Sequence, residues 1–158
     1  MVKLDETEFR KAMGIFATGV TIVTCRDAEG RPTGMTVNSF TSVSLDPPLL
    51  LWCVNRSILP FPAFSKTEHF AVHVLNREQE ALSNHFAIDR PDKFTDIDYS
   101  EGVAGLPVFP DFLGLYQCQV HDRVDAGDHI ILVGRLVDYE IRTGEPLVFY
   151  GGDYHSIV

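Results

Sequence analysis

The sequence predicts a mainly β (α+β) domain in which six or seven antiparallel strands close into a small barrel beside two or three helices. Runs of β-branched and aromatic residues recur along the chain, and Gly, Pro and Asp turn signals separate them. The length of 158 residues fits one domain, 1–158, with no linker and no internal repeat. Closure into a barrel removes exposed sheet edges, which favours a barrel over an open sheet.

A helix is expected first. Asp5 followed by Glu8 is a capping pair, and Thr7 is an alternative N-cap. Apolar residues then recur at helical spacing and predict one apolar face that ends before Gly19. They are Phe9, Ala12, Met13, Phe16 and Ala17.

The period then changes to that of strands. Residues 20–25 predict a strand, and residues 35–45, rich in Thr, Ser and Val, predict a second. The almost wholly apolar segment 49–54 predicts a third strand, buried on both faces. Residues 58–66 predict a Pro-punctuated loop with one helical turn, and residues 69–75 predict a fourth strand.

A second capping box, Asn76 with Gln79, predicts a helix that runs to about Phe86. Residues 87–114 carry several Pro and Gly and predict a long loop, which in a compact domain usually covers a site or wraps a partner. Three more strands are expected. They span 116–124, 130–142 and 146–150, with turns at 125–128 and 143–145.

Composition excludes several function classes. The formal net charge of −9, with no basic run, argues against a nucleic-acid partner. Residues 1–9 lack the apolar core of a signal peptide, and no stretch approaches the roughly 20 apolar residues of a membrane span. The widely spaced Cys25, Cys53 and Cys118 suit reduced thiols, so a cytoplasmic location is expected.

No metal site is predicted. His69 and His73 lie four apart in a strand, which separates them by about 13 Å, too far to chelate one ion. They are interpreted as two half-buried strand histidines. Asp122, Asp125 and Asp128 lack the spacing of a calcium loop and indicate a solvated turn.

The familiar nucleotide motifs, G-x-G-x-x-G after a strand and the P-loop, are absent. The candidate anion cradle is the segment 36–41, where small hydroxyl side chains and backbone N–H groups could wrap a phosphate or the polar edge of a heterocycle. Thr and Ser also favour strands, so composition alone leaves both interpretations open.

The segment 34–48, GMTVNSFTSVSLDPP, resembles the hallmark segment of the short-chain flavin reductases, the reductase components of two-component flavin monooxygenases. The resemblance extends from about Phe9 to Tyr154. It continues, in order, through 16–21, 70–75, 92–94, 126–129, 134–135, 146–150 and 152–154.

This resemblance implies a homodimer of Greek-key split barrels with flavin in a groove near the subunit interface. The residues that would line the isoalloxazine, chiefly through backbone groups, are Thr36, Val37, Asn38 and Ser39. Ser39 and Thr41 would help hold the ribityl phosphate. The residues that would flank the flavin from the next strand and loop are Cys53, Val54, Asn55 and Ser57.

The family pattern also places His85 and Phe86 against the flavin and directs Lys93 toward phosphate. His129 and Tyr154 would face the nicotinamide as the catalytic pair, with His129 orienting the amide or donating a proton. Three of these residues have a plainer alternative. His129 could be a turn histidine bonded to Asp128, Tyr154 a packed aromatic ring, and Lys93 a solvated surface lysine. Lys93 and Arg56 are the candidate local cations of this acidic chain.

The implied function is an NAD(P)H:flavin oxidoreductase that transfers hydride from NADH or NADPH to FMN or FAD and supplies reduced flavin to a partner oxygenase. The cofactors carry this chemistry, so no acid–base triad is needed. The Pro-rich segment 58–62 departs from the family pattern, so the choice between FMN and FAD as the bound flavin stays open. The alternatives are a non-catalytic FMN electron carrier or redox sensor, and a split-barrel oxidoreductase acting on a pyridoxine-type or corrinoid substrate.

Overall fold

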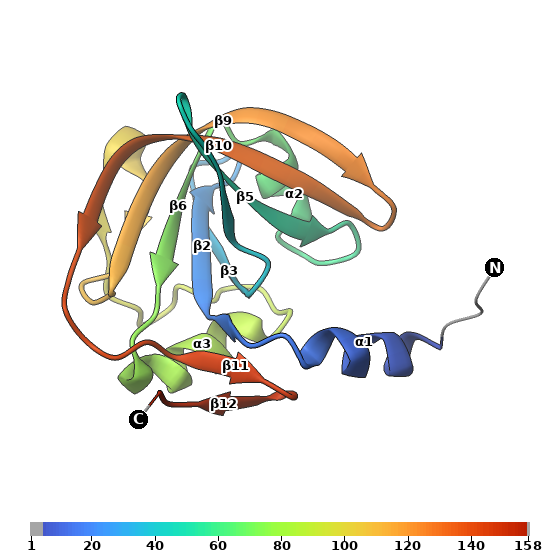
Figure 1. Cartoon of the computed structure of the whole chain (residues 1–158). Helices are drawn as coiled ribbons and strands as arrows, with labels where there is room; N and C mark the ends of the chain where they lie inside the picture. The colour runs from blue at the N-terminus through green and yellow to red at the C-terminus, as the bar shows by residue number, and fades with distance from the viewer. Residues whose placement is uncertain (1–4, 158) are drawn as a thin grey trace.

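The computed structural model describes residues 5–157 (Figure 1). Seven strands form one antiparallel sheet in the order β3-β2-β6-β9-β10-β5-β4. They are β2 (Thr21–Arg26), β3 (Pro32–Val37), β4 (Thr41–Leu45), β5 (Pro48–Asn55), β6 (His69–Val74), β9 (Gly114–Ala126) and β10 (His129–Ile141). The predicted fold class is confirmed.

The two edge strands of this sheet, β3 and β4, follow each other in sequence. Only Asn38, Ser39 and Phe40 join them. A three-residue link holds the two edges close together, so the sheet must curl round until its edges meet. The barrel is therefore closed by a covalent bend at this point, rather than by a strand ladder.

Two smaller sheets flank the barrel. One contains β1 (Thr18–Gly19), β11 (Val148–Tyr150) and β12 (Asp153–His155), and the other pairs β7 (Ser100–Glu101) with β8 (Pro107–Val108). Both lie on segments outside the main sheet. The short strands β7 and β8, with the 3₁₀ turn η2 (Val103–Gly105), interrupt the long loop predicted at 87–114.

Three α-helices accompany the strands. They are α1 (Glu6–Gly14), α2 (Phe61–Lys66) and α3 (Glu80–Ala87), the last preceded by the 3₁₀ turn η1 (Arg77–Gln79). Asp5 is the N-cap of α1 and accepts from the Thr7 amide, and Asn76 with Gln79 forms the predicted capping box. The helix α1 ends at Gly14, not at Gly19 as expected.

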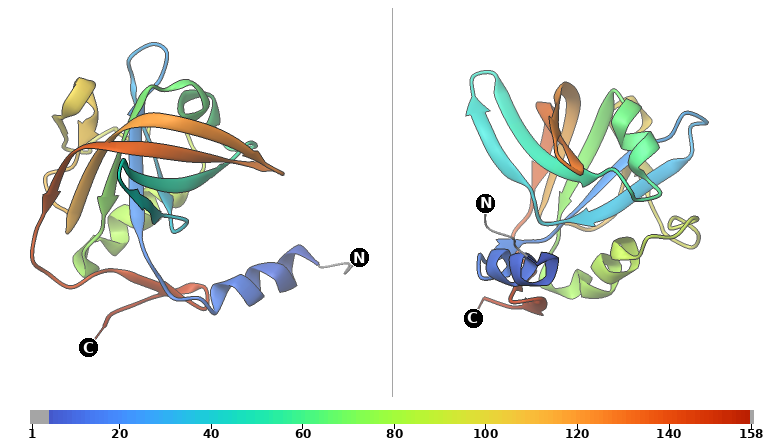
Figure 2. Two further views of the ribbon diagram at one scale, coloured as in Figure 1. Left: turned by 45° about the horizontal axis from the view of Figure 1, so that its top comes forward. Right: turned by 90° about the vertical axis from the view of Figure 1, so that its right-hand side faces the viewer.

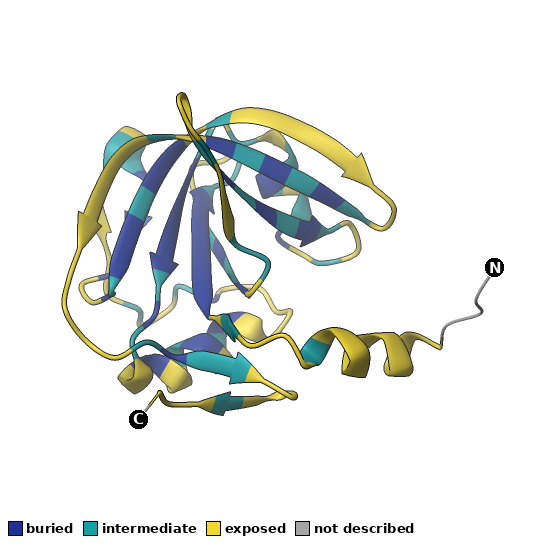
Figure 3. Ribbon diagram, viewed as in Figure 1, coloured by how far each residue is buried: buried dark blue, intermediate teal, exposed yellow. Residues whose placement is uncertain are grey.

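The helix α1 extends away from the barrel, and none of its described residues is buried (Figures 1, 2 and 3). Its end is tied to the turn between β11 and β12 by a bond of 2.9 Å from the Gly151 amide to the Gly14 carbonyl. The predicted apolar face therefore exists, but residues 5–157 leave it exposed. Residues 1–4, included in the signal-peptide prediction, and residue 158 of the predicted domain lie outside the described residues.

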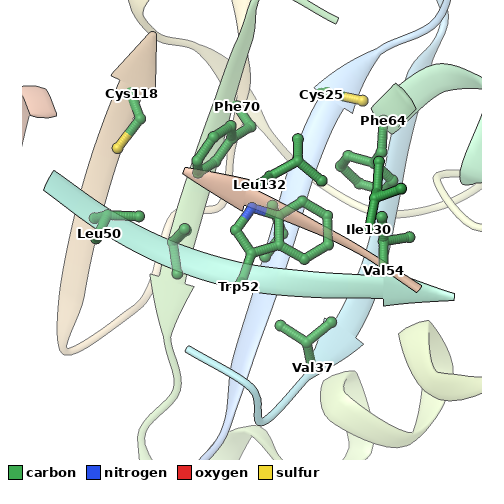
Figure 4. Close-up of a cluster of buried hydrophobic side chains, with 12 residues drawn as sticks. Cys25, Val37, Leu50, Trp52, Val54, Phe64, Phe70, Cys118, Ile130 and Leu132 are labelled. Carbon is green, nitrogen blue, oxygen red and sulfur yellow. The ribbon is translucent and has the colours of Figure 1, made fainter. Parts of the chain in front are cut away.

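Trp52 occupies the centre of the barrel core (Figure 4). Its ring packs edge-on against two others, with 4.9 Å between the ring centroids of Trp52 and Phe64 and 5.8 Å between those of Trp52 and Phe70. A second cluster, which includes Phe86 and Phe109, fills the space between the sheet and α3. The helix α3 is therefore fixed against the barrel, and the residues on it have defined positions.

Three strand predictions were wrong in detail. The segment 35–45 is not one strand, because it bends at 38–40 to close the barrel. The segment 49–54 is not buried on both faces, since burial in β5 alternates and only one side faces the core. The strand β9 is longer than the predicted 116–124, whereas β10 lies within one residue of the predicted 130–142, and β12 was not predicted.

His73 is wholly buried, not half-buried as expected. Its Nδ1 lies 3.1 Å from the Ile22 carbonyl, and its Nε2 accepts from the Phe109 amide at 3.3 Å. Burial lowers the pKa of this imidazole to about 4. Within residues 5–157 no group of three or more His, Cys, Asp or Glu side chains is placed to hold a metal ion, and no helix there is long and apolar enough to span a membrane.

Candidate functional site

The bend between β3 and β4 holds the first group of predicted site residues. The Cys53 amide donates to the Ser39 hydroxyl at 2.9 Å, which ties the bend to β5. Asn38 and Thr41 are exposed, whereas the Val37 side chain belongs to the core, so Val37 can offer a ligand only its backbone. Within the described chain, the backbone N–H groups of 38–40 have no acceptor. The bend therefore presents free donors, as a polar ring edge or phosphate requires.

The end of β5 brings a second group together. Asn55 Oδ1 accepts from the Ser57 amide at 2.8 Å and from its hydroxyl at 2.7 Å. Asn55 pairs in register with His129 at the start of β10. Cys53 is half-buried, and burial raises the pKa of its thiol, while the Val54 side chain lies in the core.

His129 is partly exposed and bonds its neighbour, with 2.7 Å between its Nδ1 and Asp128 Oδ1. The hydrogen bond from His129 lowers the pKa of Asp128. The Asp128 carbonyl also accepts from the Arg56 amide at 2.9 Å, and the Arg56 guanidinium pairs with Asp125. The turn therefore holds the imidazole through Nδ1, and Nε2 has no partner among the described residues. Arg56, one of the two candidate cations, is neutralised.

The C-terminal end of α3 carries the third group. His85 Nε2 donates to the Lys93 carbonyl at 2.6 Å, and its Nδ1 accepts from Arg90 at 2.8 Å. Phe86 is fully buried, with its ring 5.1 Å from that of Phe94 and 5.3 Å from that of Phe109. Phe86 thus acts as a support beneath the site.

Lys93 is not a solvated surface lysine. It is 7% exposed, and its ammonium donates to the Phe86 carbonyl at 2.9 Å and the Gly34 carbonyl at 3.4 Å. Burial lowers the pKa of this lysine, and no carboxylate of the described chain forms an ion pair with it. Lys93 lines a pocket of about 520 Å³ together with Gly34, Leu59 and Arg90. A buried cation that lacks a counter-ion and faces a pocket suits an anionic ligand group.

Tyr154 lies on β12 and reaches α3. Its hydroxyl is 2.7 Å from the Ser83 hydroxyl, and its ring meets Phe149 edge-on at 5.5 Å. The Ser83 carbonyl accepts from the Thr36 hydroxyl at 2.6 Å. Ser83 is fully buried and was not among the predicted site residues. The available signal was a serine on the buried face of the predicted helix, four residues after Gln79 and three before Phe86.

The strand β3 connects the three groups. Gly34 contacts Lys93, Thr36 contacts Ser83 and through it Tyr154, and Ser39 just beyond the strand contacts Cys53. His129 and Ser57 join through β5 and Asn55. The predicted residues thus fall along one path, from the end of α3 to the end of β5.

A family model described as the flavin reductase like domain matches residues 13–158. The chain belongs to this flavin reductase family. Among its relatives is FMN reductase (NADH) SmoA of Agrobacterium fabrum, 48% identical over 150 residues that cover 95% of this chain and 85% of that protein. The reductase subunit HsaB of a Rhodococcus jostii flavin-dependent monooxygenase is 38% identical, with 98% of this chain and 79% of that protein covered.

Solved structures of the family have the same split-barrel fold. The NADH:FAD oxidoreductase SgcE6 of Streptomyces globisporus, in complex with NAD and FAD fragments, matches with a TM-score of 0.91 and 35% identity, covering 98% of this flavin reductase-like chain and 93% of that one. Some curated relatives are longer: the chain spans 49% and 48% of two of them.

Proposed function

We propose that this flavin reductase-family chain transfers hydride from NADH to FMN or FAD and releases the reduced flavin to a separate oxygenase component. The observation that carries the proposal is the path along β3, which joins free backbone donors at the bend to the buried Lys93 ammonium. Relatives named as an NADH-dependent FMN reductase and as reductase subunits of monooxygenases support it, and none of the three names given above specifies NADPH.

The residues present fit a flavin. The bend 38–40 would bind the polar edge of the isoalloxazine through backbone N–H groups, and Thr36 would contribute its backbone because its hydroxyl is engaged by Ser83. Lys93 would bind the phosphate. Ser57 and Thr41, both exposed, would lie beside the ribityl chain. The bound flavin supplies the hydride-accepting chemistry, so the chain's task is to orient two rings and exclude water.

His129 is proposed to contact the nicotinamide through Nε2, since Asp128 already holds Nδ1. Tyr154 is proposed to contact the nicotinamide side through its ring, because its hydroxyl is occupied by Ser83. Replacing the imidazole should therefore cost more turnover than removing the phenolic hydroxyl.

A second copy of this chain is proposed as a partner. Apolar side chains on and just after α1 are 48% to 77% exposed, and none of them is buried by the described residues of the same chain. They are Phe9, Met13, Ile15 and Phe16. A contiguous exposed apolar face of this kind is typical of an interface. A cytoplasmic location is proposed on the three unpaired cysteines.

The test follows NADH and NADPH oxidation by absorbance in air, with no flavin, FMN, FAD or riboflavin. Turnover that requires added flavin and saturates with it is expected. His129→Ala should lower kcat/KM about 100-fold, and Tyr154→Phe less than threefold. Protein that retains FMN through desalting and oxidises neither nucleotide would instead be a carrier or redox sensor.

A further inference from the structure

The turn after α3 carries a carboxylate, Asp89, that contacts a wall of the pocket in which the phosphate is proposed to bind. In the sequence, Asp89 lies between Phe86 and Lys93, and the Phe86 carbonyl accepts a hydrogen bond from the Lys93 ammonium. Its two carboxylate oxygens lie 3.0 Å and 3.3 Å from the Leu59 amide nitrogen, and Leu59 is a wall of the same pocket. The hydrogen bond from the Leu59 amide holds the Asp89 carboxylate near the pocket.

The charge of Asp89 is not cancelled by an ion pair within the described residues. The adjacent Arg90 directs its guanidinium to the His85 imidazole instead. Asp89 acts on Lys93 across the turn, where its negative charge opposes the effect of burial on the lysine pKa. Asp89 is not itself a wall of the pocket, but its charge acts on the Lys93 ammonium that an anion there would bind, against the opposite effect of Arg90, which does line the pocket.

We propose that Asp89 is a specificity-determining residue that weakens the binding of a flavin phosphate at Lys93, so that the flavin exchanges instead of staying bound. This inference rests on the proposed function, because it assumes that the anion in the pocket belongs to the flavin. A prosthetic flavin would be better served by an uncharged residue here. A flavin that must leave for an oxygenase requires moderate affinity.

The substitution Asp89→Asn isolates the charge, because the asparagine oxygen can still accept from the Leu59 amide. Repulsion between one partly screened carboxylate and a dianionic phosphate corresponds to about a tenfold change in affinity at low salt. Asp89→Asn is therefore expected to lower the dissociation constant of FMN about tenfold and to leave that of riboflavin, which has no phosphate, unchanged. The difference should shrink as salt is added.

Binding is measured by quenching of flavin fluorescence, without nicotinamide nucleotide. Glu80→Gln is the matched control, since it removes one exposed negative charge from the first turn of α3, at the end of the helix away from Asp89. It should leave FMN affinity unchanged. Asp89→Ala, which also removes the contact to Leu59, should match Asp89→Asn. Equal FMN affinity in Asp89→Asn and the wild-type protein overturns the inference, as does an effect seen only in Asp89→Ala.

Two further outcomes separate the possible failures. The KM for NADH, measured with riboflavin as acceptor, should not change in Asp89→Asn; a lower KM would assign the phosphate to the nicotinamide nucleotide and overturn the inference alone. A wild-type protein that binds neither flavin overturns the proposed function as well.

Discussion

Several buried polar side chains in this barrel each use their hydrogen-bonding groups in a defined way. His73 bonds β2 on one side and the segment before β9 on the other, through the Ile22 carbonyl and the Phe109 amide. The Ser83 hydroxyl bonds the Tyr154 hydroxyl, and the Ser83 backbone carbonyl accepts from the Thr36 hydroxyl. Such residues connect separate parts of the fold, because an unpaired polar group in the core would be costly.

His73 should make the stability of the protein depend on pH. Its pKa is about 4 in the folded chain against an ordinary value of 6.5, so the folded state favours the neutral ring. The stabilisation is complete above pH 6.5 and is lost as pH falls from 6.5 toward 4. The expected loss attributable to His73 at pH 5 is about 2 kcal/mol. Urea unfolding at pH 7.5 and 5 measures it.

The control for this prediction is His73→Asn, an amide that can bond one of the two partners but does not titrate. The variant will have lower stability at pH 7.5, and its further loss on going to pH 5 should be smaller by the same 2 kcal/mol. If both proteins lose equal stability over this interval, another group carries the pH dependence.

Among the elements, β9 and β10 depend on one glycine for their packing on the core. A β-carbon added at Gly134 would lie 2.4 Å from Phe70 Cζ and 2.9 Å from Cys118 Cβ, both in the barrel core (Figure 4). Gly134 also follows an irregularity in the β9–β10 register. Glycine at this position thus allows a close approach of β10 to β6.

Gly134→Ala should therefore destabilise the protein by about 1–3 kcal/mol through overpacking. Shortening the opposing ring with Phe70→Leu should recover part of that loss, so the two changes would be non-additive in a double-mutant cycle. Gly19→Ala is the control, because its added carbon meets no atom within 4 Å. Denaturant midpoints are measured for the four proteins of the cycle and for the control, and simple additivity in the cycle would show that the contact is relieved elsewhere.

Element positions were predictable where local signals decide them. The capping box at Asn76 and the β-branched run that forms β2 are examples. The break between β3 and β4 was not predictable, because residues 38–40 have a strand-like composition and bend only because closure of the barrel requires it. The burial of Lys93 was also not predicted. It depends on the Gly34 carbonyl, which is distant in sequence, and on the Phe86 carbonyl near the C-terminal end of α3.

The site as a whole was predicted through family resemblance rather than through residue patterns. Its parts lie on β3, β5, α3, β10 and β12, and a local pattern in any one of them is weak. What brings them together is the sheet order, which places β5 beside β10 and lets α3 pack on β3. Sheet order depends on non-local contacts, which a pass along one sequence cannot read.

For the whole molecule, the exposed α1 face should be the surface that joins two copies. Met13→Glu with Phe16→Glu introduces two charges at side chains that are 57% and 77% exposed, so the fold of one copy should survive. The wild-type protein is expected to sediment as a dimer and the variant as a monomer, because two charges in an apolar interface cannot be paired. Far-UV circular dichroism checks that the variant is folded.

The matched control is Lys11→Glu on the same helix, whose side chain is 71% exposed. It lowers the net charge by two, as the double variant does, but leaves the apolar face intact, so the dimer should persist. If the second copy also completes the flavin groove, the monomeric variant will bind FMN more weakly than Lys11→Glu does, although every residue of the β3 path is present in each copy. A monomeric variant with unchanged FMN affinity would place the whole flavin site within one chain, and a dimeric variant would move the interface away from α1.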